Sequence, residues 1–322
     1  MPKLGVIGFG AMNVDYLYRV GQIVTDGEDL VEEFMALPGG SAANTIYGLA
    51  KLGVRTGFIG AVSDDENGNL LLKDFKAVGV DTSQVRVEKG TKTGSVLCLS
   101  DKLGRRSLYV SPGANSQLKQ NQVDLHYVNQ AQAVHLSSFV DEEQFKIQVN
   151  LVEEKANSVT ITLAPGMLYT KKGLGTLAPL LQKTHILFLN REEIELLTGK
   201  NFRDGAEECI RYGCQIIVIT LGKGLALEGD KVITSYIFDG KQTYQTESKS
   251  RESSPLAETT GAGDAFAAGF LFGTLKGKEL RECGILGDLM ARFVITRAGA
   301  RQGLPDLNQL SESYFRYCGE KL

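Results

Sequence analysis

The sequence has few of the residues that form disulfide frameworks or zinc sites. Only five of its 322 residues are cysteine and three are histidine, and no two cysteines form a Cys-x-x-Cys pair. The histidines do not cluster near the cysteines along the chain. This pattern argues against a zinc site and is typical of reduced cytoplasmic thiols.

The sequence also lacks long hydrophobic runs and an excess of either charge. It contains no run of about 18 apolar residues, and its first twenty residues do not follow a signal-peptide pattern. Lys and Arg total 35 and Asp and Glu total 38, so the formal charge is −3 and no basic footprint for nucleic acid is present. We expect a cytoplasmic protein with neither a nucleic-acid nor a membrane partner.

Proline is scarce, with 7 residues, whereas glycine is abundant, with 37. The glycines follow no regular period, so they indicate tight turns and close backbone contacts. Hydrophobic residues make up 43% and charged residues 23% of the chain, as is ordinary for a globular protein. A chain of this length is expected to form one large domain with an appendage, or two domains.

Apolar runs of strand length alternate with amphipathic segments of helix length. The expected strands of the main sheet are 4–10, 55–61, 133–137, 159–163, 185–189 and 216–221. The expected helices are 41–52, 67–78, 141–155, 262–275, 280–297 and 307–317. Segment 245–255 is polar and is expected to be a loop. Alternating strands and helices predict an α/β fold, a doubly wound and mostly parallel sheet flanked by helices.

Short strand-like segments within 16–37 and 94–111 carry many polar residues, which makes them too exposed for a central sheet. We expect them to form a small β-sheet lid attached to a single domain of residues 1–322. A lid next to Gly39 and Gly40 would keep water away from whatever those glycines bind. The alternative is an ordinary hairpin at the edge of the main sheet.

A run of small residues precedes the apolar helix expected at 262–275. Gly261, Ala262 and Gly263 allow consecutive backbone N–H groups to point at one spot at a helix N-terminus, which suits a transferring phosphoryl group. Asp264 follows in the first helical turn, where a carboxylate can act as a base toward an incoming hydroxyl. The alternative is an ordinary helix start with an acid in its favoured position.

Two further clusters offer groups that could bind a polyol. Gly39 and Gly40 allow close approach of the backbone, and Asn44 would lie on the first turn of the helix that follows. Asn13 and Asp15 come after the first strand, where α/β sheets bind ligands, and an amide with a carboxylate suits a vicinal diol. The glycines before Asn13 do not complete a dinucleotide fingerprint, and no helix follows, so a dehydrogenase is disfavoured.

Later segments suggest a nucleotide site. Asn190 can cap the helix after strand 185–189, and Glu193 could reach a hydrated Mg²⁺, although the pair also fits a simple capping box. Residues 220–224 are expected to form a turn after a buried strand that could pass beneath a nucleotide. No P-loop and no Gly-x-Ser-x-Gly motif is present in the sequence.

These motifs, in this order along nearly the whole chain, resemble those of the ribokinase-like, or PfkB-type, carbohydrate kinase family. The segments that carry the resemblance are 39–44 with its continuation to Gly53, Asn190-x-x-Glu193, 220–224, 258–269 and 296–300. The resemblance implies a doubly wound α/β domain with a β lid, often a homodimer through that lid. It also implies transfer of the γ-phosphoryl group of ATP, with Mg²⁺, to a hydroxyl of a small molecule.

The resemblance assigns roles by position. Asp264 is the expected base, and Gly261, Ala262 and Gly263 the expected anion hole. The expected sugar contacts are Asn13, Asp15, Gly39, Gly40 and Asn44. The expected nucleotide contacts are Asn190, Thr220, Gly222 and Gly224, and Glu193 is expected to hold Mg²⁺ through water. Glu258 and Thr260 match a pair that binds an activating monovalent cation, but the family more often has Asp at position 258, so K⁺ activation stays open.

The acceptor also stays open at this point. A free, ribose-like sugar is the first choice, because Asn13, Asp15 and Asn44 suit a polyol. A nucleoside is the second, with Phe139 as a stacking candidate for the base. A sugar phosphate such as ribose 1-phosphate or fructose 6-phosphate is the third. The candidates for gripping its phosphate are Arg105, Arg106, Lys249 and Arg251. Outside the enzymes, a non-catalytic sensor of a sugar or nucleotide is the alternative.

Overall fold

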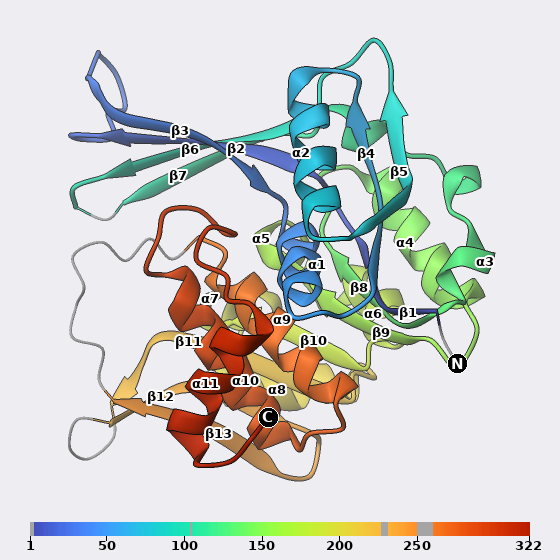
Figure 1. Ribbon diagram of the computed structural model, residues 1–322, viewed down its shortest axis with the longest axis vertical. Helices are drawn as coiled ribbons and strands as arrows, with labels where there is room; N and C mark the ends of the chain where they lie inside the picture. The colour runs from blue at the N-terminus through green and yellow to red at the C-terminus, as the bar shows by residue number, and fades with distance from the viewer. Residues whose placement is uncertain (1–2, 104, 227–230, 250–259) are drawn as a thin grey trace.

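The structure, a computed structural model, describes residues 3–103, 105–226, 231–249 and 260–322 (Figure 1). Its main sheet has nine strands in the order β13-β12-β11-β10-β9-β8-β1-β4-β5. Their bounds are β1 Leu4–Phe9, β4 Thr56–Ser63, β5 Asp81–Glu88, β8 Ala131–Ser137, β9 Thr160–Ala164, β10 Ile186–Asn190, β11 Ile216–Ala226, β12 Lys231–Phe238 and β13 Thr243–Lys249. Neighbouring strands from β5 to β11 in this order pair in parallel. The β11–β12 and β12–β13 pairs are antiparallel.

Helices cover both faces of this sheet (Figure 1). One face carries α1 Ser41–Lys51, α2 Glu66–Ala77, α9 Ala262–Leu275, α10 Leu280–Val294 and α11 Leu307–Cys318. The other face carries α3 Leu125–Val128, α4 Glu142–Glu154, α5 Gly166–Thr170, α6 Gly173–Leu181, α7 Arg191–Thr198 and α8 Phe202–Arg211. The short 3₁₀ helices η1 Gly113–Gln117 and η2 Gln120–Gln122 lie between β7 and α3.

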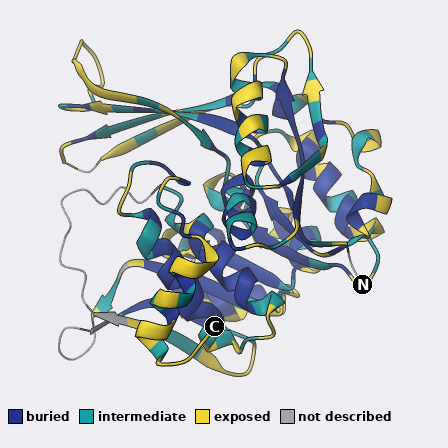
Figure 2. Cartoon of the chain, viewed as in Figure 1, coloured by how far each residue is buried: buried dark blue, intermediate teal, exposed yellow. Residues whose placement is uncertain are grey.

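Each face of the sheet has its own hydrophobic core, because strand side chains alternate between the faces. Val6 and Phe188 belong to the core under α1 and α9, whereas their neighbours Ile7 and Leu187 belong to the core under α4 and α6. Figure 2 shows the central strands of the main sheet and the helix faces packed on them as buried, whereas the outer helix faces are exposed. The predicted doubly wound, mostly parallel α/β fold is confirmed.

A second sheet of four strands projects from the main body on one side (Figure 1). It has the order β3-β2-β6-β7, with β2 Asn13–Val20, β3 Val31–Gly39, β6 Gly94–Asp101 and β7 Arg106–Ser111. We call it the small sheet. Strands were expected in these regions, but β2 begins at Asn13 rather than residue 16, so Asn13 and Asp15 lie within the strand and not in a loop before it.

Two other expectations about local structure were wrong. Segment 245–255 was expected to be a loop, yet its described part lies in β13, where pairing with β12 satisfies the backbone of a polar edge strand. Residues 220–224 were expected to be a turn, yet β11 continues through them and accommodates them by a register shift against β12 between Thr220 and Leu225.

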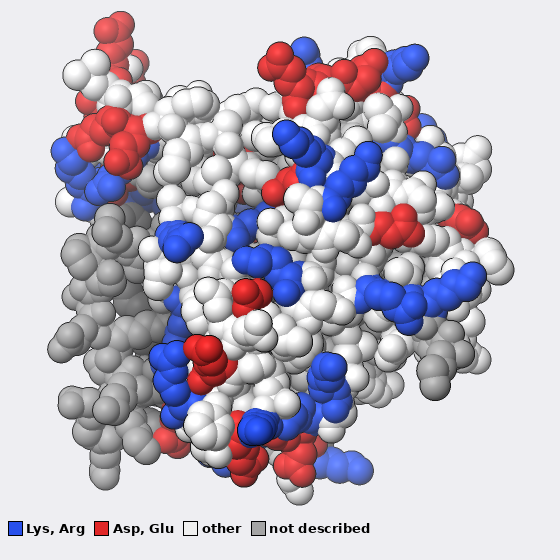
Figure 3. All heavy atoms as spheres, viewed as in Figure 1, with Lys and Arg blue, Asp and Glu red and all other residues white. Residues whose placement is uncertain are grey.

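The surface carries side chains of both charges. On the face drawn in Figure 3, acidic and basic side chains are interspersed, and acidic ones gather at the tip of the small sheet. Within the described ranges, no helix is both long and apolar enough to cross a bilayer.

Candidate active site

A cleft lies between the small sheet and the N-terminal ends of α1 and α9. Its larger cavity has a volume of about 320 Å³. Asp15 of β2 and Arg106 of β7 line it from the small sheet, and Asn44 and Asp264 line it from the helices. Two motifs that are distant in the sequence therefore face one space.

The carboxylate of Asp264 is held by two side chains of α1. The hydroxyl of Ser41 donates to Oδ1 at 2.7 Å, and the amide of Asn44 donates to Oδ2 at 2.8 Å. The hydroxyl of Thr45 donates to the main-chain carbonyl of Asp264 at 3.2 Å. These bonds fix the carboxylate at the first turn of α9, and each oxygen keeps a lone pair for another partner.

Burial shapes the electrostatics of this carboxylate. Burial raises the pKa of Asp264, while the hydrogen bonds from Asn44 and Ser41 and the charge of Arg301 act in the opposite direction. Burial also raises the pKa of Glu193, and the charge of Asp264 adds to that rise. A raised carboxyl pKa brings the group closer to the working range of a general base.

The two glycines at the start of α9, Gly261 and Gly263, differ in the space around them. Gly261 has a φ of 77°, and a Cβ there would lie 2.3 Å from the Cβ of Ala300. A Cβ on Gly263 would meet no heavy atom within 4 Å. No side chain caps the N-terminus of α9, where Ala262 is the first helical residue. The N-terminus of α9 is thus an uncapped, positively polarised helix end, and Gly261 and Asp264 of this end line the larger cavity.

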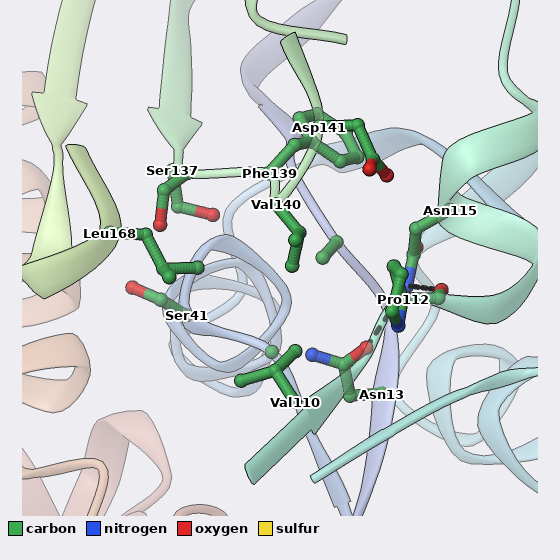
Figure 4. A pocket seen from close by; sticks show the side chains of 13 residues that line it. Asn13, Ser41, Val110, Pro112, Asn115, Ser137, Phe139, Val140, Asp141 and Leu168 are labelled. Atoms are coloured by element: carbon green, nitrogen blue, oxygen red, sulfur yellow. Dashed lines mark hydrogen bonds between the residues drawn. The ribbon is translucent and has the colours of Figure 1, made fainter. Parts of the chain in front are cut away.

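Asn13 offers an N–H donor to the smaller cavity beside the main one, about 110 Å³ in volume. Its Oδ1 accepts a hydrogen bond from Nδ2 of Asn115 at 3.0 Å, so its own Nδ2 turns into the cavity (Figure 4). Asn115 also bonds the backbone N–H and carbonyl of Met12, at 2.9 and 3.1 Å. Asn115 was not predicted from the sequence, because it stands in no motif.

Gly39 and Gly40 make room for neighbouring groups. A Cβ on Gly39 would lie 2.3 Å from Oδ2 of Asp15. Gly40 has a φ of 96°, and a Cβ there would lie 2.3 Å from the carbonyl oxygen of Ala11. Gly40 lines both cavities, and Gly39 allows Asp15 to lie against the end of β3.

Asn44 is less available to a ligand than the sequence suggested. It is 4% exposed, and its Oδ1 accepts a hydrogen bond from Nε of Arg301 at 2.8 Å. Because its Nδ2 already donates to Asp264, one N–H remains for a ligand. Arg301, one residue beyond the last predicted motif, was also missed by the sequence analysis.

The predicted nucleotide residues lie at the carboxyl end of β10 and along the neighbouring part of β11. Asn190 and Thr220 are register partners in this parallel pair. Oδ1 of Asn190 accepts from the backbone N–H of Glu193 at 2.8 Å, and a carboxylate oxygen of Glu193 accepts from that of Asn190 at 2.9 Å. The pair therefore forms the capping box that was the alternative interpretation. Gly222 and Gly224 have φ values of 59° and 89° in the irregular part of β11.

The structure separates the remaining candidates. Arg105 forms an ion pair with Asp101 at 2.7 Å at the tip of the β6–β7 hairpin, whereas Arg106 lines the larger cavity. Phe139 is 2% exposed and packs edge-on against Phe9, so only a small part of its ring borders the smaller cavity.

The remaining candidates for binding K⁺ or a sugar phosphate lie in different parts of the chain. Thr260 lines the larger cavity. Lys249 is the last residue of β13. Glu258 and Arg251 lie outside the described residues.

Comparison with known proteins identifies the family. A model of the pfkB family carbohydrate kinases matches residues 5–307. The chain belongs to this family. An uncharacterized sugar kinase of Archaeoglobus fulgidus is 37% identical to it over 263 residues, which are 80% of this chain and 98% of that protein.

Other relatives differ in the acceptor that their names state. An ATP-dependent ribose-1-phosphate kinase of Halopiger xanaduensis is 28% identical over 302 residues, covering 92% of this chain and 93% of that protein. The crystal structure of adenosine kinase from Sinorhizobium meliloti superimposes with a TM-score of 0.82 at 25% identity, over 97% of this chain and 99% of that chain. This PfkB-family chain is therefore a sugar kinase, a phosphotransferase acting on a hydroxyl, and the predicted enzyme class is confirmed.

Proposed function

We propose that this kinase transfers the γ-phosphoryl group of ATP to a hydroxyl of a ribose-like sugar, with Asp264 as general base. The observation that carries the proposal is the position of the Asp264 carboxylate. It lies in the first turn of α9, beside an uncapped helix N-terminus, and lines the same cavity as Asn13 and Asp15. A base and an anion-binding helix end in one cleft suit an in-line phosphoryl transfer.

The proposed reaction uses each group once. Asp264 takes the proton of the acceptor hydroxyl as the oxygen attacks the γ-phosphorus. The bond from γ-phosphorus to the bridging oxygen then breaks, and ADP leaves with the electron pair. The N–H groups of Ala262 and Gly263 stabilise the charge on the transferring phosphoryl group, while Gly261 allows the chain to enter the helix in the required geometry.

The acceptor is proposed from the polar groups of the cleft. Asp15 offers a carboxylate and Asn13 an amide N–H, a combination that binds two neighbouring hydroxyls. Asn44 offers its remaining N–H, and Gly39 and Gly40 allow the sugar to approach the backbone. The small sheet is proposed to act as a lid, because its strand β2 carries the sugar contacts Asn13 and Asp15 and closure would exclude water.

The nucleotide is proposed to lie at the end of β10 and against the neighbouring part of β11, beside Asn190, Thr220, Gly222 and Gly224. Mg²⁺ fits here because burial raises the pKa of Glu193 and the charge of Asp264 raises it further, so a cation near these two carboxyl groups would be favoured. Glu193 would hold the hydrated ion, which neutralises phosphate oxygens when bound. Activation by K⁺ through Glu258 and Thr260 stays a prediction.

Two features favour other acceptors. The smaller cavity shares Asn13, Gly40, Ser41 and Val110 with the larger one, and Figure 4 shows Val110, Val140 and Leu168 pointing into it. A nucleoside would place its sugar in the larger cavity and its base between these apolar side chains. Arg106, which also lines the larger cavity, would instead favour a sugar phosphate.

The experiment is a coupled kinase assay with Mg-ATP against ribose, fructose, adenosine, cytidine, ribose 1-phosphate and fructose 6-phosphate, with and without K⁺. Ribose or fructose as the best acceptor supports the proposal. A nucleoside would assign the smaller cavity to a base, and a sugar phosphate whose KM rises in Arg106→Ala would assign Arg106 to its phosphate. ATP binding without turnover on any acceptor would mean either an acceptor outside this panel or the sensor alternative.

The small sheet also has an apolar outward side. The outward side of the small sheet exposes Phe34, Leu97 and Tyr109, at 53%, 37% and 61%, and we propose that this side forms a homodimer interface. Light scattering should give a dimer mass for the native chain and a monomer mass for Phe34→Glu. We also propose that the enzyme works in the cytoplasm, where ATP and reduced thiols coexist.

A further inference from the structure

Arg301 lies in the irregular segment between α10 and α11, and it is almost completely enclosed. It is 4% exposed, although arginine side chains are rarely buried without a specific role for the guanidinium. Its guanidinium lies over the rings of Tyr47 and Phe75, each with its centroid 5.2 Å away. These two rings fix the plane of the guanidinium and hence the directions of its N–H groups.

Three polar groups from three elements accept hydrogen bonds from this one side chain. Nε donates to Oδ1 of Asn44 on α1 at 2.8 Å, and Nη2 donates to the carbonyl of Gly39 at the end of β3 at 3.0 Å. Nη1 pairs with the carboxylate of Asp74 on α2 at 2.5 Å. Arg301 therefore joins the point where the small sheet meets the main body to the helix that carries Asn44.

The bond to Asn44 determines what that residue presents to Asp264. An amide side chain has one accepting and one donating end. Because Arg301 can only donate, it binds Oδ1 and leaves Nδ2 facing the Asp264 carboxylate, to which it donates at 2.8 Å. Without Arg301 the amide could rotate and place its oxygen against the carboxylate.

Both Arg301 and Asp264 interact with several charged or titratable groups. Asp74 and Asp15 both face Arg301, as does the phenol of Tyr47. Asp264 interacts electrostatically with Arg301 and with Glu193 of α7, in addition to its bonds from Ser41 and Asn44. The positive charge of Arg301 lowers the pKa of Asp264 and so opposes the effect of burial on that carboxyl.

We propose that Arg301 is a positioning residue for catalysis, which orients the amide of Asn44 toward Asp264 and ties that pair to the base of the small sheet at Gly39. The inference rests on the proposed role of Asp264 as the base. It adds a part that no motif contains, a buried cation acting on the base through a neighbouring amide.

The first test measures the Asp264 carboxyl itself, without substrate. The native chain is labelled with ¹³C-aspartate, the Asp264 signal is assigned by its loss in Asp264→Asn, and its titration is followed by NMR. Arg301→Gln removes the charge and the forked donor and should raise the pKa of Asp264 by about one unit. Arg297→Gln, an exposed arginine in the same segment, is the matched control and should leave the titration unchanged.

The second test measures turnover with Mg-ATP and the best acceptor of the assay described above. Arg301→Gln should lower kcat roughly 10- to 100-fold with the KM for ATP changed less than about twofold, and should move the acid limb of the pH profile upward. Arg301→Lys keeps the charge without the fork, so it should restore the pH profile more fully than kcat. Arg301→Lys also serves if Arg301→Gln does not fold.

The outcomes separate the two claims. An unchanged Asp264 titration together with unchanged kcat in a folded Arg301 variant would overturn the positioning role. A shifted titration with unchanged kcat would leave the contact in place and count against Asp264 as the base. A loss of kcat equal to the loss of folded protein, with the pH profile unmoved, would reduce Arg301 to a structural residue and also overturn the proposal.

Discussion

The hydroxyl of Ser41 donates to the carboxylate of Asp264 at 2.7 Å, although the two residues are 223 positions apart in the sequence. This bond joins the N-terminal ends of α1 and α9 into one site. It brings the glycines before α1, which face the proposed sugar position, next to those before α9, which face the proposed phosphate position.

Asp264→Asn should lower kcat by about 10³-fold while leaving ATP affinity within a few fold, because general-base catalysis contributes roughly 10²–10⁴ and the amide cannot take the proton. Stopped assays of turnover and calorimetric titration with ATP would check both parts. Turnover near the native rate would show that another group takes the proton.

Gly263→Ala and Gly261→Ala should fail for different reasons. A Cβ at 263 meets no protein atom, so this variant should fold with native stability yet lose turnover, because its methyl group occupies space needed by the phosphoryl group. A Cβ at 261 clashes with Ala300 at a φ of 77°, so that variant should lose about 2 kcal/mol of unfolding free energy. Denaturant unfolding and kinetics on the same samples separate the two effects, and equal stability of both variants would contradict the prediction.

Asn115→Asp should raise the KM for the acceptor about tenfold with a smaller change in the KM for ATP. The carboxylate still accepts from the backbone of Met12 but cannot donate to Oδ1 of Asn13, so Asn13 loses its fixed orientation. Steady-state kinetics with each substrate varied in turn would measure the split. Asn150→Asp on α4, where the native amide donates to Gln120 at 3.0 Å, is the control. Equal changes in both KM values would argue against a role at the acceptor.

The burial of His135 should make the free energy of unfolding depend on pH. It is completely buried in β8, its Nδ1 lies 2.9 Å from the hydroxyl of Thr162, and burial lowers its pKa to about 3. Since the unfolded chain takes up the proton near pH 6.5, stability should fall as pH drops below that value and continue to fall toward pH 3. Between pH 7 and pH 5 this one group should cost about 2 kcal/mol.

The measurement for His135 is urea unfolding at both pH values. His135→Asn, which keeps a polar atom near Thr162 without a titrating ring, should lose less stability on acidification than the native chain. His126→Asn, at an exposed position, should behave as the native chain does. The same acid-induced loss in all three would exclude His135 as the cause.

Local sequence patterns predicted the regular elements well where apolar residues carry the pattern. The helix expected at 262–275 has those bounds in α9, and the helix starting at Ser41 is found one residue shorter at its end. Polar elements were missed or misplaced. The polar segment that forms β13 was expected to be a loop. This expectation failed because the strand depends on hydrogen bonds from β12 and not on its own composition.

The sequence by itself determined the fold class, the motifs at the two helix starts and the family, because glycine runs, capping residues and apolar periods act over a few neighbouring positions. Only the tertiary structure decided which polar groups meet at the site. Asn115 orients Asn13 from 102 positions away, and Arg301 reaches Asn44 from 257 positions away. Such contacts depend on where the folded backbone places single side chains, and no local pattern in the chain encodes that placement.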